Sequence, residues 1–195
     1  MTQELEIEFK NVLTKQQYET LLKKFHVSNE MIVHQTNHYF DTKEFRLKEL
    51  FSGLRIRVTN KKIVCTLKER TATNTHLETT DVITREQADL MLTGRGFFAE
   101  SVKIRLSQLG VPVEHLHHFG TLSTERVEIS HKGGTLVFDH SFYLNCDDYE
   151  VEYETNEENR GRKVFENFLK ENDIPQKAAD KKIARFMSAL KMQKG

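Results

Sequence analysis

The chain has 195 residues, of which 37% are hydrophobic and 30% are charged. Its 29 basic and 29 acidic residues cancel, which argues against a uniformly electropositive nucleic-acid-binding protein. Thirteen Phe, five Tyr and only two Pro distinguish the composition from that of a disordered protein. The length suits one domain, and we expect residues 1–195 to form it.

Short segments in which apolar and polar residues alternate predict β-strands. In chain order, strands are expected at 5–10, 34–39, 54–58, 63–69, 76–83, 122–129, 135–140 and 147–154. Helical spacing predicts helices at 14–26, 88–92, 100–109, 157–172 and 177–192. Short turns join most consecutive strands, so the strands are expected to be antiparallel. The fold class is therefore α+β, with a helical insertion at about 84–120, before the sixth strand, and C-terminal helices at about 157–192.

Two local features refine this assignment. Thr14 with Gln17 has the spacing of a capping box, which predicts a helix start. Cys65 alternates with Ile63 and Leu67 on an apolar face, which predicts a reduced core residue rather than a metal ligand or half of a disulfide. The sequence contains no apolar run long enough to span a membrane and no secretory segment before the first strand. A soluble, cytoplasmic protein without a membrane partner is expected.

The first and last strands each carry carboxylates on one face. Residues 5–10 alternate Glu6 and Glu8 with apolar side chains, and residues 149–154 alternate three glutamates with three hydrophobic residues. Like charges on paired strands are unfavourable, and two carboxylates at ~4 Å repel by roughly 4 kcal/mol at an effective dielectric of about 20. If these two faces meet, a divalent cation is the simplest partner that would stabilise them.

Basic residues dominate the corresponding positions of the middle strands, namely Arg55, Arg57, Lys68 and Arg126. A closed antiparallel barrel would bring the first and last strands together and place the basic strands across a lumen. Arg and Lys suit phosphate oxygens, and a carboxylate cluster suits Mg²⁺ or Mn²⁺. The alternative is an ordinary one-sided sheet whose charged residues are all solvated.

The same residues resemble the motifs of the CYTH superfamily, the triphosphate tunnel metalloenzymes. Residues 6–10 match its Glu-x-Glu-x-Lys signature. Further similar segments follow in order at 39–42, 54–57, 66–68, Glu78, Arg126, Asp139 and the strand of Glu150, Glu152 and Glu154. Residues 180–185 resemble the family's Ser-Lys-x-x-Arg helix start. The resemblance covers nearly the whole chain.

Two segments depart from the family pattern. His76 and Thr80 lie where the family often has Arg-x-Glu-x-Glu, and Thr124 lies where it often has the lysine of Lys-x-Arg. The predicted tunnel is therefore less charged than that of a typical member.

The resemblance implies an eight-stranded antiparallel β-barrel with flanking helices that acts on triphosphates with Mg²⁺ or Mn²⁺. The favoured activity is hydrolysis of inorganic triphosphate or another small organic triphosphate. One alternative is an adenylate cyclase of class IV type, which makes cyclic AMP from ATP. The other is a non-catalytic module that binds nucleotides or polyphosphate. No stable nucleic-acid partner is expected, and a homodimer is kept as an alternative to a monomer.

The resemblance and the charge pattern together assign roles to individual residues. Phosphate contacts are assigned to Lys10, Arg55, Arg57, Lys68, Arg126, Lys182 and Arg185. Metal binding is assigned to Glu6, Glu8, Asp139, Glu150, Glu152 and Glu154. Catalytic roles are assigned to Glu6, Glu8, Lys10, Lys68 and Arg126. The cluster at 114–118, which contains three histidines, lacks the spacing of a helical metal motif and is expected to be an exposed loop.

Overall fold

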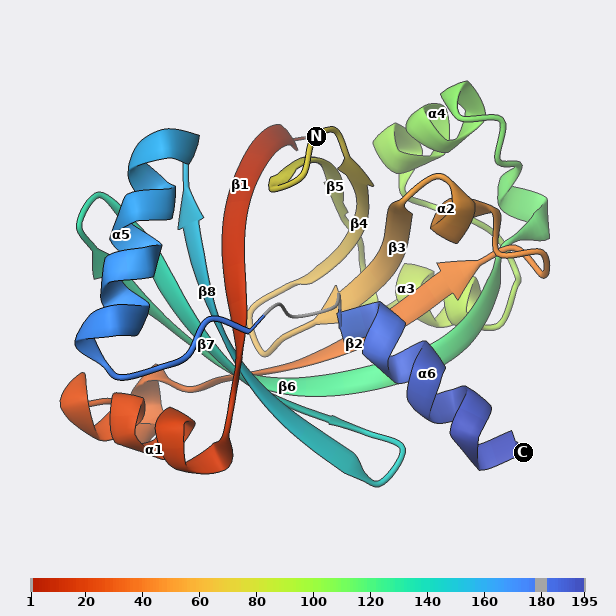
Figure 1. The fold of residues 1–195 in the computed structure, drawn as a ribbon. Helices are drawn as coiled ribbons and strands as arrows, with labels where there is room; N and C mark the ends of the chain where they lie inside the picture. The colour runs from red at the N-terminus through yellow and green to blue at the C-terminus, as the bar shows by residue number, and fades with distance from the viewer. Residues whose placement is uncertain (1, 178–181, 195) are drawn as a thin grey trace. The chain divides into compact units, whose positions relative to one another are not determined.

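Eight strands form a closed antiparallel barrel in this computed structural model, which describes residues 2–177 and 182–194 (Figure 1). The strands are β1 (Thr2–Leu13), β2 (Val33–Asp41), β3 (Ser52–Val58), β4 (Ile63–Arg70), β5 (Thr75–Val82), β6 (His117–His131), β7 (Gly134–Tyr143) and β8 (Cys146–Thr155). Their order around the barrel is β1-β5-β4-β3-β2-β6-β7-β8. The predicted α+β class with an eight-stranded antiparallel barrel is confirmed.

Six α-helices accompany the strands in the described part of the chain. They are α1 (Lys15–Lys24), α2 (Arg46–Glu49), α3 (Arg85–Leu92), α4 (Glu100–Gln108), α5 (Glu158–Glu171) and α6 (Lys182–Lys194). Short 3₁₀ turns lie at Asn29–Met31 and Val113–His115. The predicted capping box of α1 is present, since Thr14 accepts a hydrogen bond from the Gln17 amide and the Gln17 side chain accepts one from Thr14.

The chain divides into two compact units. One contains Met1–Leu5 and Gln35–Leu122, and the other contains Glu6–His34 and Ser123–Gly195. We refer to them as the first and second unit. The expectation that residues 1–195 form a single domain stays a prediction.

In the first unit, strands β2 to β5 pair in sequence order and helices α3 and α4 cover an apolar core. Leu54, Ile56, Cys65 and Leu67 are fully buried in that core, which confirms the prediction for Cys65. Arg105 connects α4 to β4, because its Nε and Nη2 donate to the two carboxylate oxygens of Glu69 at 2.7 and 2.9 Å.

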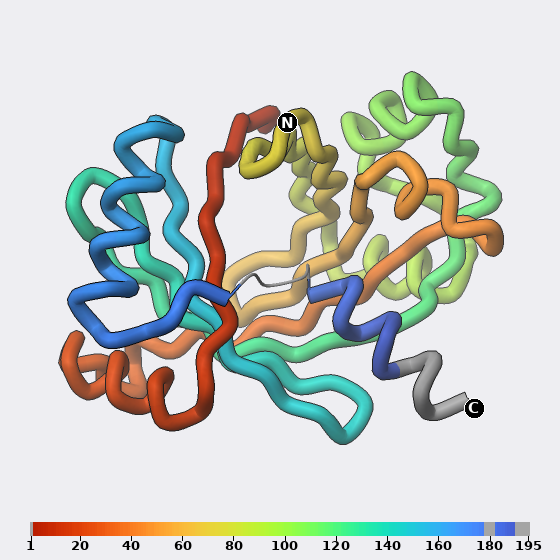
Figure 2. The backbone as a smooth tube through the Cα atoms, in the orientation of Figure 1, coloured from red at the N-terminus to blue at the C-terminus, as the bar shows by residue number. Residues whose placement is uncertain are grey.

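In the second unit, strands β6, β7 and β8 form a meander, and β8 pairs with residues 7–13 of β1. The backbone trace shows β7 returning along β6 after a tight turn at residues 132 and 133 (Figure 2). Helix α5 packs beside β8 (Figure 1). The core between these elements is rich in aromatic side chains, including Phe9, Phe138, Phe165 and Phe168.

A hydrogen-bonded clamp ties the end of β1 to the segment that precedes α6. The Asn11 side chain donates from Nδ2 to the Pro175 carbonyl at 3.2 Å and accepts from the Lys177 amide at 2.6 Å. The Val12 amide donates to the Lys177 carbonyl at 3.2 Å. Asn11 is almost fully buried, so this clamp fixes Lys177 on the sheet.

The structure corrects several boundaries. Strand β6 begins at His117, five residues before the predicted start, so His117 and His118 belong to a strand rather than to an exposed loop. The helix predicted to run to residue 26 ends at Lys24, because His26 has φ 52° and leaves the helical region. Leu5, the first apolar residue of the alternating segment 5–10, is 67% exposed and does not belong to the core. Asp180 and Lys181, part of the predicted helix start, lie outside the described residues.

Within the described ranges, each helix is too short or too polar to cross a membrane.

Candidate functional site

The register of the second unit gathers charged side chains on one face of four strands. Arg126 of β6 lies opposite Asp139 of β7, and Asp139 lies opposite Glu150 of β8. Directly paired residues of neighbouring strands project from the same face of a sheet. The side chains of Arg126, Asp139 and Glu150 therefore lie next to one another on this face. Lys10 and Glu8 of β1 pair with Glu152 and Glu154 of β8, which adds further charged side chains beside them.

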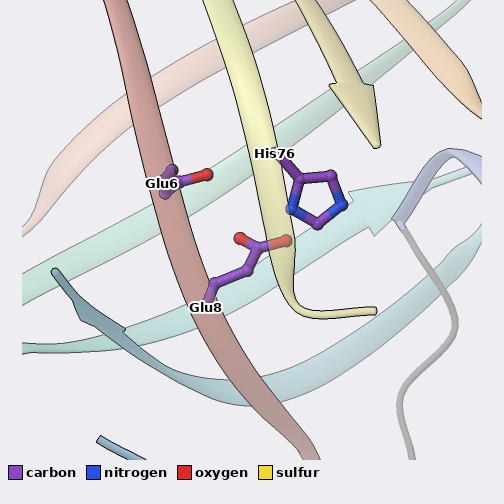
Figure 3. Close-up of side chains that lie close together, drawn as sticks. All are labelled: Glu6, Glu8 and His76. Carbon is purple, nitrogen blue, oxygen red and sulfur yellow. The ribbon is translucent and has the colours of Figure 1, made fainter. Parts of the chain in front are cut away.

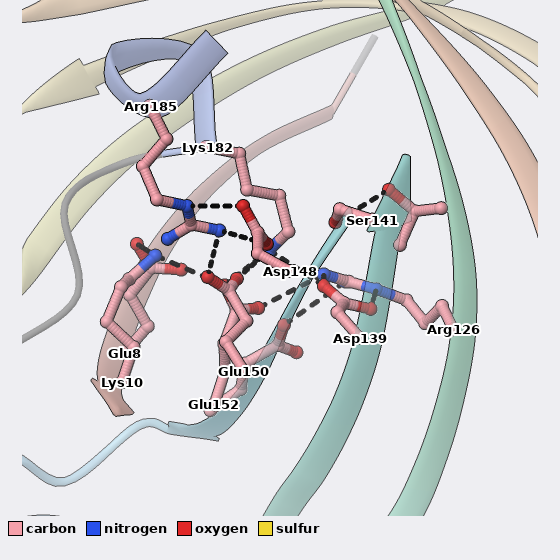
Figure 4. Close-up of polar contacts among 12 residues, drawn as sticks. Glu8, Lys10, Arg126, Asp139, Ser141, Asp148, Glu150, Glu152, Lys182 and Arg185 are labelled. Atoms are coloured by element: carbon pink, nitrogen blue, oxygen red, sulfur yellow. Dashed lines mark hydrogen bonds and ion pairs between the residues drawn. The ribbon is translucent and has the colours of Figure 1, made fainter. Parts of the chain in front are cut away.

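Arg126 makes a bidentate ion pair with Asp139. Its Nε and Nη2 donate to the two Asp139 carboxylate oxygens at 2.8 and 2.6 Å, and Nη2 also donates to Glu152 at 3.1 Å (Figure 4). The Asp139 side chain is fully buried. Burial alone would raise the pKa of Asp139, but Arg126 and Lys182 hold that pKa below its usual value. Asp139 is therefore an anion within this cluster.

Two basic side chains of α6 contact carboxylates of β7 and β8 (Figure 4). The ammonium of Lys182 lies 2.7 Å from Asp139 Oδ2 and 3.0 Å from Glu152 Oε1, and it also donates to Glu150. Arg185 donates to both Asp148 oxygens at 2.9 and 3.0 Å and to Glu150 at 2.6 Å. The first turn of α6 is thus held by carboxylates of β7 and β8.

Strand β1 adds carboxylates and one lysine. Figure 3 shows Glu6 and Glu8 on β1, and it also labels His76 of β5. Lys10 Nζ lies 3.1 Å from both Glu8 and Glu152. Burial alone would lower the pKa of Lys10, but these two carboxylates raise it above its usual value.

Glu154 is a carboxylate of this group whose pKa lies close to neutrality. Burial is the main cause and raises the pKa of Glu154 to about 7. Arg126 lowers that pKa, while the nearby carboxylates of Glu6 and Glu152 raise it further. Negative charge therefore accumulates where β1 and β8 pair, because Glu8 lies opposite Glu154 in the register.

The first unit holds a separate group of cations on β3 and β4. Arg55 Nη2 lies 3.8 Å and Lys68 Nζ 3.4 Å from the same Glu78 oxygen. Arg57 donates from Nε to the Asn37 side-chain carbonyl at 2.8 Å. Burial alone would raise the pKa of Glu78, but the three cations lower it. Arg55, Arg57 and Lys68 thus gather around one carboxylate, and a group of cations of this kind suits a polyanion.

Comparison with known proteins identifies the family. A family model of the CYTH domain matches residues 4–187. The chain belongs to the CYTH domain family. The predicted resemblance is therefore confirmed over nearly the whole chain.

Three similar proteins come from Bacillus subtilis, Bacillus halodurans and Hippeastrum. The putative triphosphatase YjbK of Bacillus subtilis strain 168 is 41% identical over 186 residues, which cover 95% of this chain and 96% of that protein. A crystal structure of a putative adenylate cyclase from Bacillus halodurans has 38% identity and a TM-score of 0.91, and the match covers 95% of this chain and 99% of the other. A putative adenylyl cyclase from Hippeastrum, described as having a dominant triphosphatase activity, has 26% identity and a TM-score of 0.75 over 95% of each chain.

The donor set of this CYTH protein fits a hard divalent cation. Asp139, Glu150 and Glu152 are buried, and each offers a carboxylate oxygen within 4.8 Å of the others. Oxygen ligands of this kind suit Mg²⁺ or Mn²⁺. The structure brings these three together with Lys182, so the same oxygens bind a cation of the chain itself.

Some predicted site residues have partners other than those expected. Arg126, Lys182 and Arg185 were assigned to phosphate oxygens, and all three contact carboxylates in the structure. The assignment to phosphate stays a prediction for a ligand-bound state. Thr124, at a position often charged in the family, is buried, and its hydroxyl lies 3.3 Å from that of Ser141.

Asp148, Glu78 and the side-chain amide of Asn37 contact the charged residues of the two units, but the sequence had not assigned a site role to any of them. Asp148 binds Arg185, and it lies two residues before Glu150, so continuing the alternation by one step would have found it. Glu78 contacts two cations; it is one of the positions that match the family pattern, but it was not assigned a site role. Asn37 accepts a hydrogen bond from Arg57, and no motif in the sequence indicated this contact.

Proposed function

We propose that this CYTH protein hydrolyses a small triphosphate, either inorganic triphosphate or an organic triphosphate, with the help of Mg²⁺ or Mn²⁺. The grouping of Arg55, Arg57 and Lys68 around Glu78 is the observation that carries this proposal. A polyanion can pair with several grouped cations at once, and Arg and Lys are suitable donors to phosphate oxygens. The names of the Bacillus subtilis and Hippeastrum relatives support hydrolysis as the reaction.

The proposed roles follow from charge and position. Arg55, Arg57 and Lys68 bind and orient phosphate oxygens, and Lys10, Arg126, Lys182 and Arg185 supply further positive charge. The proposed metal ligands are Glu6, Glu8, Asp139, Glu150, Glu152 and Glu154. A bound divalent ion would neutralise phosphate charge and help to orient the attacking water. Positioning and charge stabilisation provide most of the catalysis in phosphoryl transfer, so the catalytic group Glu6, Glu8, Lys10, Lys68 and Arg126 needs no covalent nucleophile.

Adenylate cyclase activity is the second candidate, because two structurally similar proteins bear that name. Hydrolysis is preferred, since one of these two is described as having a dominant triphosphatase activity. A non-catalytic polyphosphate-binding module is the third candidate, motivated by uncharged residues at Thr80 and Thr124. The cytoplasmic location and the oligomeric state stay predictions.

One assay separates the three candidates. The purified protein is incubated with inorganic triphosphate or ATP and with Mg²⁺, Mn²⁺ or EDTA, and phosphate and cyclic AMP are measured together. Metal-dependent phosphate release without cyclic AMP is expected. Cyclic AMP as the main product from ATP would establish the cyclase instead, and triphosphate binding without either product would establish the binding module.

Replacing Arg57 with alanine is expected to weaken triphosphate binding by about 1.5–3 kcal/mol, the usual contribution of a hydrogen bond to a charged group. The change removes a guanidinium that donates to the neutral side-chain carbonyl of Asn37, and the loss of that hydrogen bond leaves no unpaired charge on Asn37. Isothermal titration calorimetry with inorganic triphosphate measures the effect. Lys61→Ala, an exposed residue of the β3–β4 turn, is the matched control. Equal affinity in both variants would remove Arg57 from the site.

A further inference from the structure

The ammonium of Lys182 lies where the best carboxylate ligand set of the second unit would hold a metal ion. It contacts Asp139, Glu150 and Glu152, the same three residues whose oxygens lie within 4.8 Å of one another. The side chain of Lys182 is only 13% exposed, so these contacts are made away from bulk solvent (Figure 4). An ammonium and a divalent cation cannot both use these oxygens at close range, since like charges repel strongly in a poorly solvated site.

Several basic side chains already share the carboxylates of this cluster. Lys10 and Arg126 contact Glu152, Arg126 and Lys182 contact Asp139, and Lys182 and Arg185 contact Glu150. A divalent cation that binds the same oxygens would be repelled by the cations already there. The repulsion is smallest when one of these side chains moves away as the ion binds.

Lys182 is the cation whose removal disturbs the fold least. Arg126 belongs to β6 and forms a bidentate pair, and Lys10 belongs to β1, so both are fixed within the sheet. Lys182 is the first residue of α6 and contributes no strand pairing. It is also a point charge on a long flexible side chain, which can change partners more readily than a planar guanidinium.

We propose that Lys182 occupies the divalent-cation site of the ligand-free protein and leaves Asp139, Glu150 and Glu152 when these residues bind a divalent cation. Once released, its ammonium turns to the phosphate oxygens of the substrate. The release depends only on the geometry of the second unit, whereas the second step rests on the proposed function. Binding of the divalent cation thus releases Lys182, and the released side chain then contributes to binding of the triphosphate.

The first test measures Mn²⁺ binding in the absence of triphosphate, by calorimetry or by the electron paramagnetic resonance signal of free Mn²⁺. Lys182→Met keeps the length of the side chain and removes the competing charge, so Mn²⁺ is expected to bind at least about tenfold more tightly than to the wild type. The same variant is expected to bind triphosphate with Mn²⁺ more weakly, because the released cation is missing. A residue with a merely structural role would not change the two affinities in opposite directions.

Two control variants complete this test. Lys182→Arg retains the competing charge and is expected to bind Mn²⁺ within a few-fold of the wild type. Lys163→Met removes an exposed lysine of α5 and is expected to change neither affinity. Mn²⁺ affinity in Lys182→Met that equals or falls below that of the wild type would overturn the proposal.

A second measurement uses the wild type alone and does not depend on whether the variants fold. Hydrogen exchange of the α6 amides is expected to accelerate when Mn²⁺ is added without triphosphate, while exchange in α5 stays unchanged. Unaltered exchange in α6 at saturating Mn²⁺ would also overturn the proposal. Phosphate release by the wild type tests the proposed function separately. If the wild type hydrolyses triphosphate but Lys182→Met does not change Mn²⁺ affinity, the inference about Lys182 fails. If Lys182→Met changes Mn²⁺ affinity but the wild type releases no phosphate, the proposed function fails.

Discussion

Replacing Arg126 with methionine is expected to destabilise the protein by about 3–5 kcal/mol, the usual cost of removing one partner of a buried ion pair. Asp139 is fully buried and loses its bidentate partner in this variant, and Glu152 loses a further donor at 3.1 Å. Methionine fills much of the volume of the arginine stem, so the effect reports the missing charge rather than a cavity. Denaturant unfolding without metal or triphosphate measures the change in the free energy of unfolding.

The matched control is Arg46→Met. Arg46 pairs with Glu49 on the surface, where both side chains are more than half exposed, so its removal should cost about 0–1 kcal/mol. Adding Asp139→Asn to Arg126→Met is expected to recover part of the lost stability, because the buried carboxylate is no longer charged. Wild-type stability in the Arg126→Met variant would show that the pair with Asp139 does not stabilise the fold.

Replacing both Glu6 and Glu8 with glutamine is expected to reduce metal-dependent phosphate release by at least about a hundredfold, the scale on which preorganised charges act in active sites. Glutamine keeps the size of each side chain but removes the negative charge that a divalent ligand set requires. The fold is expected to remain, because Lys10 keeps its contact with Glu152 when Glu8 is neutral. Phosphate release is compared over a range of Mg²⁺ or Mn²⁺ concentrations, with thermal unfolding as the check on the fold.

Glu166→Gln with Glu171→Gln serves as the control, since it removes two exposed carboxylates of α5. That control should retain wild-type turnover. Turnover by the Glu6 and Glu8 double variant at the wild-type rate would assign both residues to the surface rather than to the metal site.

The strands of this fold could be predicted because a half-buried strand alternates apolar residues, which face the core, with polar residues, which face the other side. In residues 149–154 the hydrophobic side chains belong to the core and the glutamates to the opposite face, as their alternation indicated. Short turns such as residues 59–62 indicated which strands pair with each other. The candidate site residues of the strands followed from the same alternation, since it identifies which side chains share a face. Lys182 and Arg185 came instead from the resemblance to the family's Ser-Lys-x-x-Arg helix start.

Alternation does not determine which charges meet. It placed Arg126 on the same face as the carboxylates, but only the β6–β7 register sets its guanidinium against Asp139. Helix α2 was missed for a related reason. Its first turn depends on the Asp41 carboxylate, which accepts from the Leu47 and Lys48 amides at 2.8 and 3.1 Å, and four residues carry no helical periodicity. Interactions between distant segments, rather than local propensity, specify both features.

The clamp between Asn11 and Lys177 sets an upper limit on how far Lys182 can travel. Lys182 follows Lys177 by five residues, and an extended chain spans at most about 3.3–3.6 Å per residue, so its backbone remains within roughly 18 Å of the clamp. A side chain that is covalently connected to the clamp over so few residues meets nearby anions at an effective concentration in the millimolar range. Rebinding is then an intramolecular event, independent of protein concentration, and its rate depends on chain length rather than on diffusion through solution.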